Sequence, residues 1–231
     1  NKDTIHMSIK EFKENGYKVI DWIADYYENI ESYPVLSNIK PGELRKGLPK
    51  NPPKEGENFI NILSDMNDKI IPGVTHWQSP NFFAYFPCNS TGPAILGDLL
   101  SSGLGIQGML WASSPSCTEL ESHVLDWLVD MLHLPKKFKS DTLGGSVIQD
   151  TASSATLCAL IAAREKISNG KINENGFDNS IRVYTSTEAH SSIEKAVKIA
   201  GIGSNNIRLV EVDQDFSMDP VKLRKAINMD I

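Results

Sequence analysis

The segment from Gly144 to Ala155 carries the residue types that bind a phosphate group. Two glycines lead into an apolar pair, Val147 and Ile148, and then into a series of small and hydroxyl side chains. We predict that a strand ends here and that a helix begins at about Ser153. The first turn of a helix has unpaired N–H groups and a partial positive charge, and small side chains let a phosphate approach them. An ordinary Ser or Thr helix cap gives the same pattern, so the segment alone leaves both interpretations open.

His190 is the second residue whose position could support chemistry. It follows a predicted strand over residues 181–186 and precedes a predicted helix over residues 191–200. Ligands of open α/β sheets bind outside the carboxyl ends of the strands, where an imidazole can stack on a ring or transfer a proton. A histidine that merely lies beside the start of a helix would occupy the same place. Position alone does not separate these two interpretations.

A third group of candidates is aromatic and lies in residues 76–115, which are also rich in Gly, Ser and Pro and include a predicted helix over residues 93–102. Long irregular stretches of this kind are often functional. Aromatic side chains there could line an apolar pocket, although on these residues alone packing in a core is the better explanation. The candidates are Trp77, Phe82, Phe83, Tyr85, Phe86 and Trp111.

Composition argues against several other functions. The net charge is −6 and the basic residues are scattered, whereas a nucleic-acid-binding protein usually has a basic stripe. The three cysteines are widely spaced without a CxxC pair, so we expect neither a metal site nor a disulfide framework, and we expect a cytoplasmic location. No apolar run approaches the roughly 20 residues of a membrane span. A GxGxxG match at Gly103, Gly105 and Gly108 follows a predicted helix rather than a strand, so it is not a dinucleotide-binding motif.

The elements that position these residues form two parts. From residue 144 onward, strands and helices alternate, which predicts an α/β domain with a parallel sheet. A helix is expected before this domain, with Ser116 and Glu119 as its capping box. The further predicted elements of the domain are a helix over residues 153–166, a strand over 207–212 and a helix over 219–228.

The first 75 residues have a different pattern. Ser8 and Glu11 predict a capping box at the start of one helix, and a second helix is expected to follow near Phe59. Residues 35–56 contain four prolines and are expected to be extended. Two helices joined by such a strap make a poor core. We therefore predict that residues 1–75 pack on a second subunit and that residues 76–231 begin the main domain.

Four stretches together resemble a known family, the group II decarboxylases that depend on pyridoxal 5'-phosphate (PLP), and specifically the aromatic-L-amino-acid decarboxylases. These stretches are residues 76–87, 111–121, 145–157 and 189–196, and they occur in the family's order. The resemblance implies the aspartate aminotransferase-like fold type I, here as an incomplete large domain. It also implies a homodimer with its active site at the subunit interface and with N-terminal helices that wrap the partner.

Residue by residue, the resemblance implies that Ala152 and Ser153 hold the cofactor phosphate. It implies that His190 is catalytic, stacks on the pyridine ring and stands near the substrate carboxylate. The expected reaction converts an aromatic L-amino acid to its aryl amine and carbon dioxide. The implied substrate pocket contains Trp77, Tyr85, Phe86, Pro87 and Cys88, with Gln107 and Met109 supplied by the other subunit.

This sequence departs from the family's pattern in three ways, one of which is that Gln107 and Met109 differ from several relatives. In the family, the Schiff-base lysine and the aspartate beside the pyridine nitrogen lie beyond the position of residue 231. We therefore expect the 231-residue chain to need a C-terminal part or a second chain, and to be inactive alone. Cys88 replaces the Thr or Ser of common relatives, and a thiol is a weaker hydrogen-bond donor. This favours Trp, Phe or Tyr as the substrate over a dihydroxyphenyl amino acid. Two alternatives remain: an aromatic acetaldehyde synthase, and a non-catalytic truncated paralogue that acts as a dimer partner.

Overall fold

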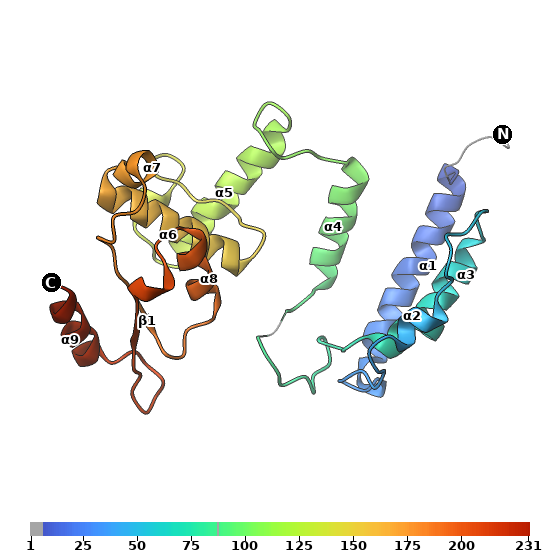
Figure 1. Ribbon diagram of the computed structural model, residues 1–231. Coiled ribbons are helices and arrows are strands. Elements are labelled where there is room, and N and C mark those ends of the chain that lie inside the picture. The colour runs from blue at the N-terminus through green and yellow to red at the C-terminus, as the bar shows by residue number, and fades with distance from the viewer. Residues whose placement is uncertain (1–6, 87) are drawn as a thin grey trace. The chain divides into compact units, whose positions relative to one another are not determined.

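The computed structural model of the protein describes residues 7–86 and 88–231, so Pro87, one of the predicted pocket residues, lies outside the described residues. The chain divides into two compact units, Asn1–Ile106 and Gln107–Ile231 (Figure 1). The sequence places a boundary after residue 75, whereas the first unit also includes most of the aromatic segment. The expectation that residues 1–75 wrap a partner subunit stays a prediction.

The first unit is built from helices and turns. Its elements are α1 (Ile9–Glu28), η1 (Ile30–Ser32), α2 (Glu43–Gly47), α3 (Phe59–Asp65), η2 (Met66–Ile70), η3 (Ile71–Gly73) and α4 (Gly92–Leu104). The predicted capping box of α1 is confirmed, because the Ser8 hydroxyl accepts from the Glu11 N–H and the Glu11 carboxylate accepts from the Ser8 N–H. The short helix α2 lies within the stretch predicted to be extended, and it ends before Pro49.

An aromatic cluster around His76 joins α1 to the segment that follows the proline-rich strap. His76 is 1% exposed, and its Nδ1 lies 2.7 Å from the Tyr26 hydroxyl. The ring of Tyr33 stacks on His76 with the centroids 4.8 Å apart, and Trp22 stacks on Tyr26. The backbone N–H of His76 donates to the Val35 carbonyl at 2.9 Å. These contacts explain why His76 belongs to the first unit rather than to the α/β domain.

The second unit contains the predicted α/β arrangement. Its elements are α5 (Pro115–Met131), η4 (Lys136–Phe138), α6 (Ala152–Ser168), α7 (Lys171–Asn175), β1 (Val183–Ser186), α8 (Ser192–Ile199), η5 (Ser204–Asn206), β2 (Ile207–Val210) and α9 (Pro220–Asp230). Strands β1 and β2 pair in parallel, with Val183 opposite Ile207. The helix α8 connects them, which confirms the predicted strand–helix–strand order.

The core of the second unit lies between α6, α8 and the sheet. Val197, Ala200 and Ile202 are buried there. The hydrophobic side chains that pack against these three are Leu157, Leu160, Ile161, Phe177, Val183, Ile193 and Ile207. The Arg164 guanidinium of α6 also donates to the Ala200 carbonyl at the end of α8. This packing holds α6 and α8 together as one body.

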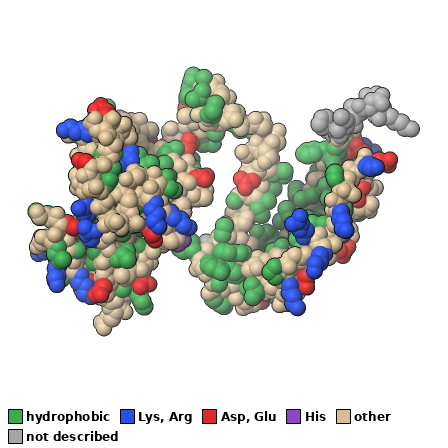
Figure 2. Space-filling model, in the orientation of Figure 1, with side chains coloured by type: hydrophobic (Ala, Val, Ile, Leu, Met, Phe, Trp, Pro, Cys, Tyr) green, Lys and Arg blue, Asp and Glu red, His purple; other side chains and the backbone are tan. Residues whose placement is uncertain are grey.

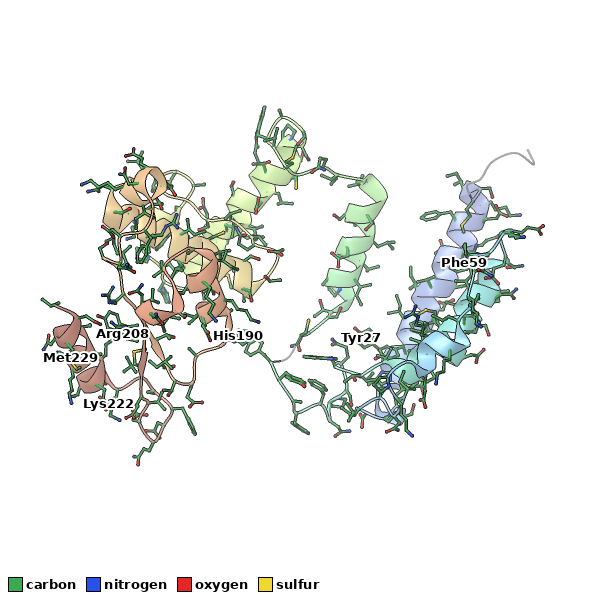
Figure 3. All side chains as sticks on the ribbon, in the orientation of Figure 1. Tyr27, Phe59, His190, Arg208, Lys222 and Met229 are labelled. Atoms are coloured by element: carbon green, nitrogen blue, oxygen red, sulfur yellow. The ribbon has the colours of Figure 1, made fainter. Side chains whose placement is uncertain are left out.

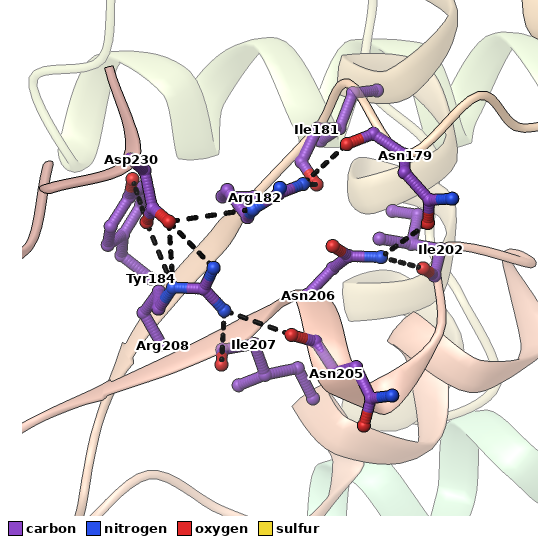
Figure 4. A network of polar contacts seen from close by, with 10 residues as sticks. All are labelled: Asn179, Ile181, Arg182, Tyr184, Ile202, Asn205, Asn206, Ile207, Arg208 and Asp230. Atoms are coloured by element: carbon purple, nitrogen blue, oxygen red, sulfur yellow. Dashed lines mark hydrogen bonds and ion pairs between the residues drawn. The ribbon is translucent and has the colours of Figure 1, made fainter.

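Helix α9 is tied to both strands through Asp230 (Figure 4). The Arg208 guanidinium contacts this carboxylate at 2.6 Å, and the Tyr184 hydroxyl donates to it at 2.8 Å. The hydrogen bond from Arg208 is the main reason that the pKa of Asp230 lies below its usual value. Arg182, just before β1, lies 3.6 Å from the same carboxylate. The network therefore lies toward the amino end of β1, while His190 follows its carboxyl end.

Two local predictions are wrong. Helix α5 begins with Pro115 after Ser114, so Ser116 is inside the first turn, and Glu119 accepts a hydrogen bond from the Trp111 indole at 2.9 Å instead of closing a capping box. Val147 and Ile148 are not in a strand, since the sheet within the described part of the chain pairs β1 with β2 alone. A strand needs a neighbour for its N–H groups, and the Ile148 N–H donates to a glutamate side chain.

Hydrophobic side chains are widely exposed on both units, and Figure 2 shows many of them on its visible face. On α4, the exposed residues include Leu96, Leu99, Leu100 and Leu104. Among the helices that the structure describes, none is both long enough and apolar enough to cross a membrane.

Candidate cofactor and substrate site

The start of α6 has the geometry of an anion-binding helix end. Thr151 is the N-cap, and its hydroxyl accepts from the Ser154 N–H at 3.2 Å. The next two N–H groups, those of Ala152 and Ser153, have no partner inside the helix because the first turn offers none. All of Thr151, Ala152 and Ser153 are exposed. Both interpretations of this segment therefore apply together, with Thr151 as the cap and the adjacent N–H groups available to a ligand.

His190 lies in the turn between β1 and α8, with its side chain exposed (Figure 3). Its Nδ1 accepts a hydrogen bond from the Ser192 N–H at 3.2 Å. This bond occupies the Nδ1 lone pair, so a neutral ring carries its proton on Nε2. The side chain thus offers an open ring face for stacking and an Nε2–H that can donate to a carboxylate.

The donors of this unit fit a phosphorylated aromatic ring. Two N–H groups, the Ser153 hydroxyl and the dipole of a helix of 17 residues suit a phosphate dianion. Residues 151–154 carry no charged side chain that would repel it. His190 follows the carboxyl end of β1, where ligands of open α/β sheets bind, and its ring can cover a pyridine face. The chemistry of these residues therefore fits PLP.

The predicted pocket residues of the first unit are partly assembled. The Trp77 ring lies 5.7 Å from that of Tyr85, with an interplanar angle of 18°, and 4.6 Å from that of Phe82. Tyr85 has a φ of 56°, a conformation that is strained for a bulky residue and is found at functional sites. Tyr85 and Phe86 are 91% and 88% exposed, so their rings are free to contact another group.

Gln78 is a residue of this region that the sequence analysis missed. Its amide nitrogen donates to the Cys88 carbonyl at 2.6 Å, and its amide oxygen accepts from the Ser90 N–H at 3.2 Å. The Gln78 amide thus pairs with one backbone carbonyl and one backbone N–H, and so fixes the backbone on either side of Asn89. The partners are ten and twelve residues away, and no periodic pattern in the sequence signals such a contact.

Gln107 and Met109, the last two predicted pocket residues, lie in the second unit. Both are exposed, and the Gln107 amide oxygen accepts from the Met109 N–H at 3.2 Å. The other described residues predicted for the pocket, Trp77, Tyr85, Phe86 and Cys88, belong to the first unit. Their contacts with a substrate stay predictions.

Comparison with known proteins identifies the family. The family described as "Pyridoxal-dependent decarboxylase conserved domain" matches residues 41–231. Tyrosine decarboxylase 2 of Narcissus pseudonarcissus is 46% identical over 227 residues, and a phenylacetaldehyde synthase of Arabidopsis thaliana is 45% identical over the same length; each alignment covers 97% of this chain. The crystal structure of Catharanthus roseus tryptophan decarboxylase in complex with L-tryptophan superposes on 98% of this chain with a TM-score of 0.90 and 42% identity.

The same comparisons measure how much of each relative is present. This chain spans about half the length of the proteins it matches: 45% of the Narcissus enzyme, 46% of the Arabidopsis enzyme and 47% of the Catharanthus chain. The predicted fold type I is confirmed by the structural similarity, and the predicted dependence on PLP is confirmed by the family. The chain belongs to the pyridoxal-dependent decarboxylase family, and residues 41–231 lie within the conserved domain of that family.

Proposed function

We propose that the protein decarboxylates an aromatic L-amino acid, with PLP as its cofactor, to give the aryl amine and carbon dioxide. The observation that carries the proposal is that one α/β unit of this family contains both a helix N-terminus with open N–H groups, that of α6, and an exposed histidine after the carboxyl end of β1, His190. Related proteins named for tyrosine, tryptophan and phenylacetaldehyde support the aromatic class of substrate.

In the proposed reaction, the first turn of α6 binds the cofactor phosphate through the N–H groups of Ala152 and Ser153. When bound, PLP supplies an electron sink for the electron pair left at the α-carbon as carbon dioxide departs. His190 stacks on the pyridine ring, and its Nε2–H orients the substrate carboxylate. The covalent attachment of the cofactor is assigned to a lysine outside these 231 residues.

The substrate's aromatic side chain is proposed to contact Trp77, Tyr85 and Phe86, with Gln107 and Met109 of a second copy. Pro87 is part of the same proposed pocket. Cys88 offers a weak S–H donor, which favours Trp, Phe or Tyr over a dihydroxyphenyl substrate. We propose a homodimer for the whole protein and a reducing, cytoplasmic location.

The test uses the purified protein with every chain that accompanies it. PLP is added, and Trp, Tyr, Phe, Dopa, His and Glu are offered separately while amine and carbon dioxide are measured. We expect amine and carbon dioxide in equal amounts from one or two of Trp, Phe and Tyr. Turnover of glutamate or histidine alone would contradict the proposed substrate class.

The similarity to phenylacetaldehyde synthases favours a second candidate function, the oxidative formation of an aromatic aldehyde. The same assay distinguishes it, because an aldehyde synthase would consume oxygen and water and release aldehyde, ammonia, carbon dioxide and hydrogen peroxide in place of the amine. A protein that binds no PLP and turns over no substrate would either lack its catalytic half or be the non-catalytic partner, and an unequal pair of chains on co-purification would identify the partner.

A further inference from the structure

Helix α5 presents three carboxylates to the segment that leads into α6. Asp130 pairs with the Lys139 ammonium at 2.7 Å. Asp126 accepts from the Ser140 N–H at 2.8 Å and from the Ser140 hydroxyl at 2.7 Å. Further toward the start of the helix, a Glu121 carboxylate oxygen accepts from the Ile148 N–H at 3.1 Å. Successive turns of one helix therefore hold successive points of the segment.

The first half of this segment is also held by contacts of its own. The Ser146 hydroxyl donates to the Phe138 carbonyl at 3.1 Å, and the Thr142 hydroxyl donates to the Lys137 carbonyl at 3.0 Å. Between Val147 and the cap at Thr151, by contrast, the backbone is outside any strand. Among the residues that the structure describes, the hydrogen bond that ties residues 147–150 to another element is the one made by Glu121.

Ile148 is three residues before the Thr151 cap. An extended residue advances the chain by about 3.3 Å, so along the chain the anchored Ile148 N–H is at most about 13 Å from the Ala152 N–H and about 17 Å from the Ser153 N–H, the two groups that open α6. A hydrogen bond to an ionised carboxylate is among the stronger ones in proteins. Releasing it would let the backbone before the cap move.

We propose that Glu121 is a positioning residue for cofactor binding: by fixing the Ile148 N–H, it fixes where the first turn of α6 meets the cofactor phosphate. This inference rests on the proposed function. Glu121 does not touch the phosphate and acts through the backbone. Asp126 binds Ser140, which is farther from the Thr151 cap along the chain, so its contacts stabilise the loop.

Loss of Glu121 and loss of Asp126 are therefore expected to rank in opposite order for their effects on melting temperature and on cofactor binding. Asp126 forms two short bonds with Ser140, which lower its pKa, whereas Glu121 forms one longer bond. Loss of Asp126 should lower the melting temperature more, and loss of Glu121 should weaken cofactor binding more. A residue that only stabilises the fold would give the same order in both measurements.

The experiment uses the purified protein with all its accompanying chains and the variants Glu121→Ala, Glu121→Gln and Asp126→Ala. PLP affinity is measured by absorbance titration, and the environment of the bound phosphate by phosphorus-31 NMR. We expect Glu121→Ala to weaken PLP binding about tenfold and to shift the phosphate resonance, as loss of one charge-assisted hydrogen bond predicts. Glu121→Gln keeps an acceptor oxygen, so its affinity should return to within about threefold of the wild type. Asp126→Ala should change the affinity by no more than about twofold.

Two results would overturn the inference alone. The first is that the wild type and the Glu121→Ala variant bind PLP with the same affinity and show the same phosphorus-31 resonance for the bound phosphate. The other is a loss of affinity that follows the loss of melting temperature across all three variants. A wild-type protein that binds no PLP would overturn the proposed function and, with it, this inference.

Discussion

At the residue scale, Thr151 determines which backbone groups at the start of α6 are available. Its hydroxyl takes the Ser154 N–H and lies 2.9 Å from the Ser154 hydroxyl, so the cap and the proposed phosphate donors are different groups of one turn. A cap and an anion site are compatible for this reason. The two interpretations compete in the sequence because the sequence pattern does not place the start of the helix to a single residue.

Thr151→Ala removes this cap, which should lower the free energy of unfolding by about 1 kcal/mol and also weaken PLP binding. Thr91→Ala is the matched control, because Thr91 caps α4 through the Ala94 N–H at 3.3 Å. We expect the control to lose similar stability with unchanged PLP affinity. Thermal unfolding and PLP titration check both variants, and equal loss of PLP affinity in the two would contradict the assignment.

The buried pair of His76 and Tyr26 predicts a pH dependence. Burial raises the pKa of Tyr26, so its hydroxyl keeps its proton and donates to Nδ1 of neutral His76. Burial also lowers the pKa of His76 below the value of about 6.5 in an unfolded chain. As the pH falls through 6.5, the unfolded chain therefore gains the proton first, and the folded first unit loses stability.

We expect the wild type to melt at a lower temperature at pH 5.5 than at pH 7.5, and His76→Gln to be less stable at pH 7.5 but less sensitive to this pH change. Unfolding followed by tryptophan fluorescence is the measurement. The same pH sensitivity in both proteins would show that His76 is not the titrating group.

At the scale of elements, the loop before α6 requires a close approach of two backbones. A Cβ atom on Gly144 would lie 1.9 Å from the Lys137 carbonyl oxygen, whereas a Cβ on Gly145 would have no atom within 4 Å. Of two adjacent glycines with the same apparent role, the structure thus requires the first. The contact joins Lys137, within η4, to the segment that α5 holds.

Gly144→Ala should move the backbone of this loop and lower the free energy of unfolding by about 1 to 3 kcal/mol, as overpacking does. The Gly145→Ala variant, by contrast, should be neutral or slightly stabilising, by at most about 1 kcal/mol. Denaturant unfolding of the two variants provides the comparison. Equal destabilisation would contradict the predicted difference between the two sites.

At the scale of the whole molecule, the accessible surface is large for the mass. The chain of 25.5 kDa exposes 18465 Å². A compact monomer of this mass would expose about 10,400 Å², and two separate compact units of half the mass would expose about 12,500 Å² together. Many large hydrophobic side chains are exposed, including Leu99 and Leu100 on α4. Such surface favours burial against further protein.

We therefore expect the 231 residues, produced by themselves, to associate, to bind a hydrophobic dye strongly, and to produce no amine above the background of free PLP. Sedimentation velocity, dye fluorescence and an amine assay measure these properties. A monodisperse monomer without dye binding would contradict the first part, and turnover above the background would refute the second.

Features that depend on near neighbours in the chain could be predicted from the amino-acid sequence. The α1 capping box, the strand–helix–strand order from β1 to β2, and α9 follow from caps and periodicities within a few residues. The cofactor and the family came from four motifs, which match a conserved domain over residues 41–231. Such patterns can be recognised in a sequence because helices and strands place side chains at fixed intervals along the chain.

Tertiary structure decided the contacts between residues distant in sequence. His76 joins Tyr26 fifty residues away, and Ile148 bonds to Glu121 twenty-seven residues away instead of to a neighbouring strand. Glu119 bonds to Trp111 because Pro115 already begins the helix. The physical reason is the same in each case: a polar group takes the partner that packing brings within hydrogen-bond distance, and that partner is set by the fold rather than by spacing along the chain.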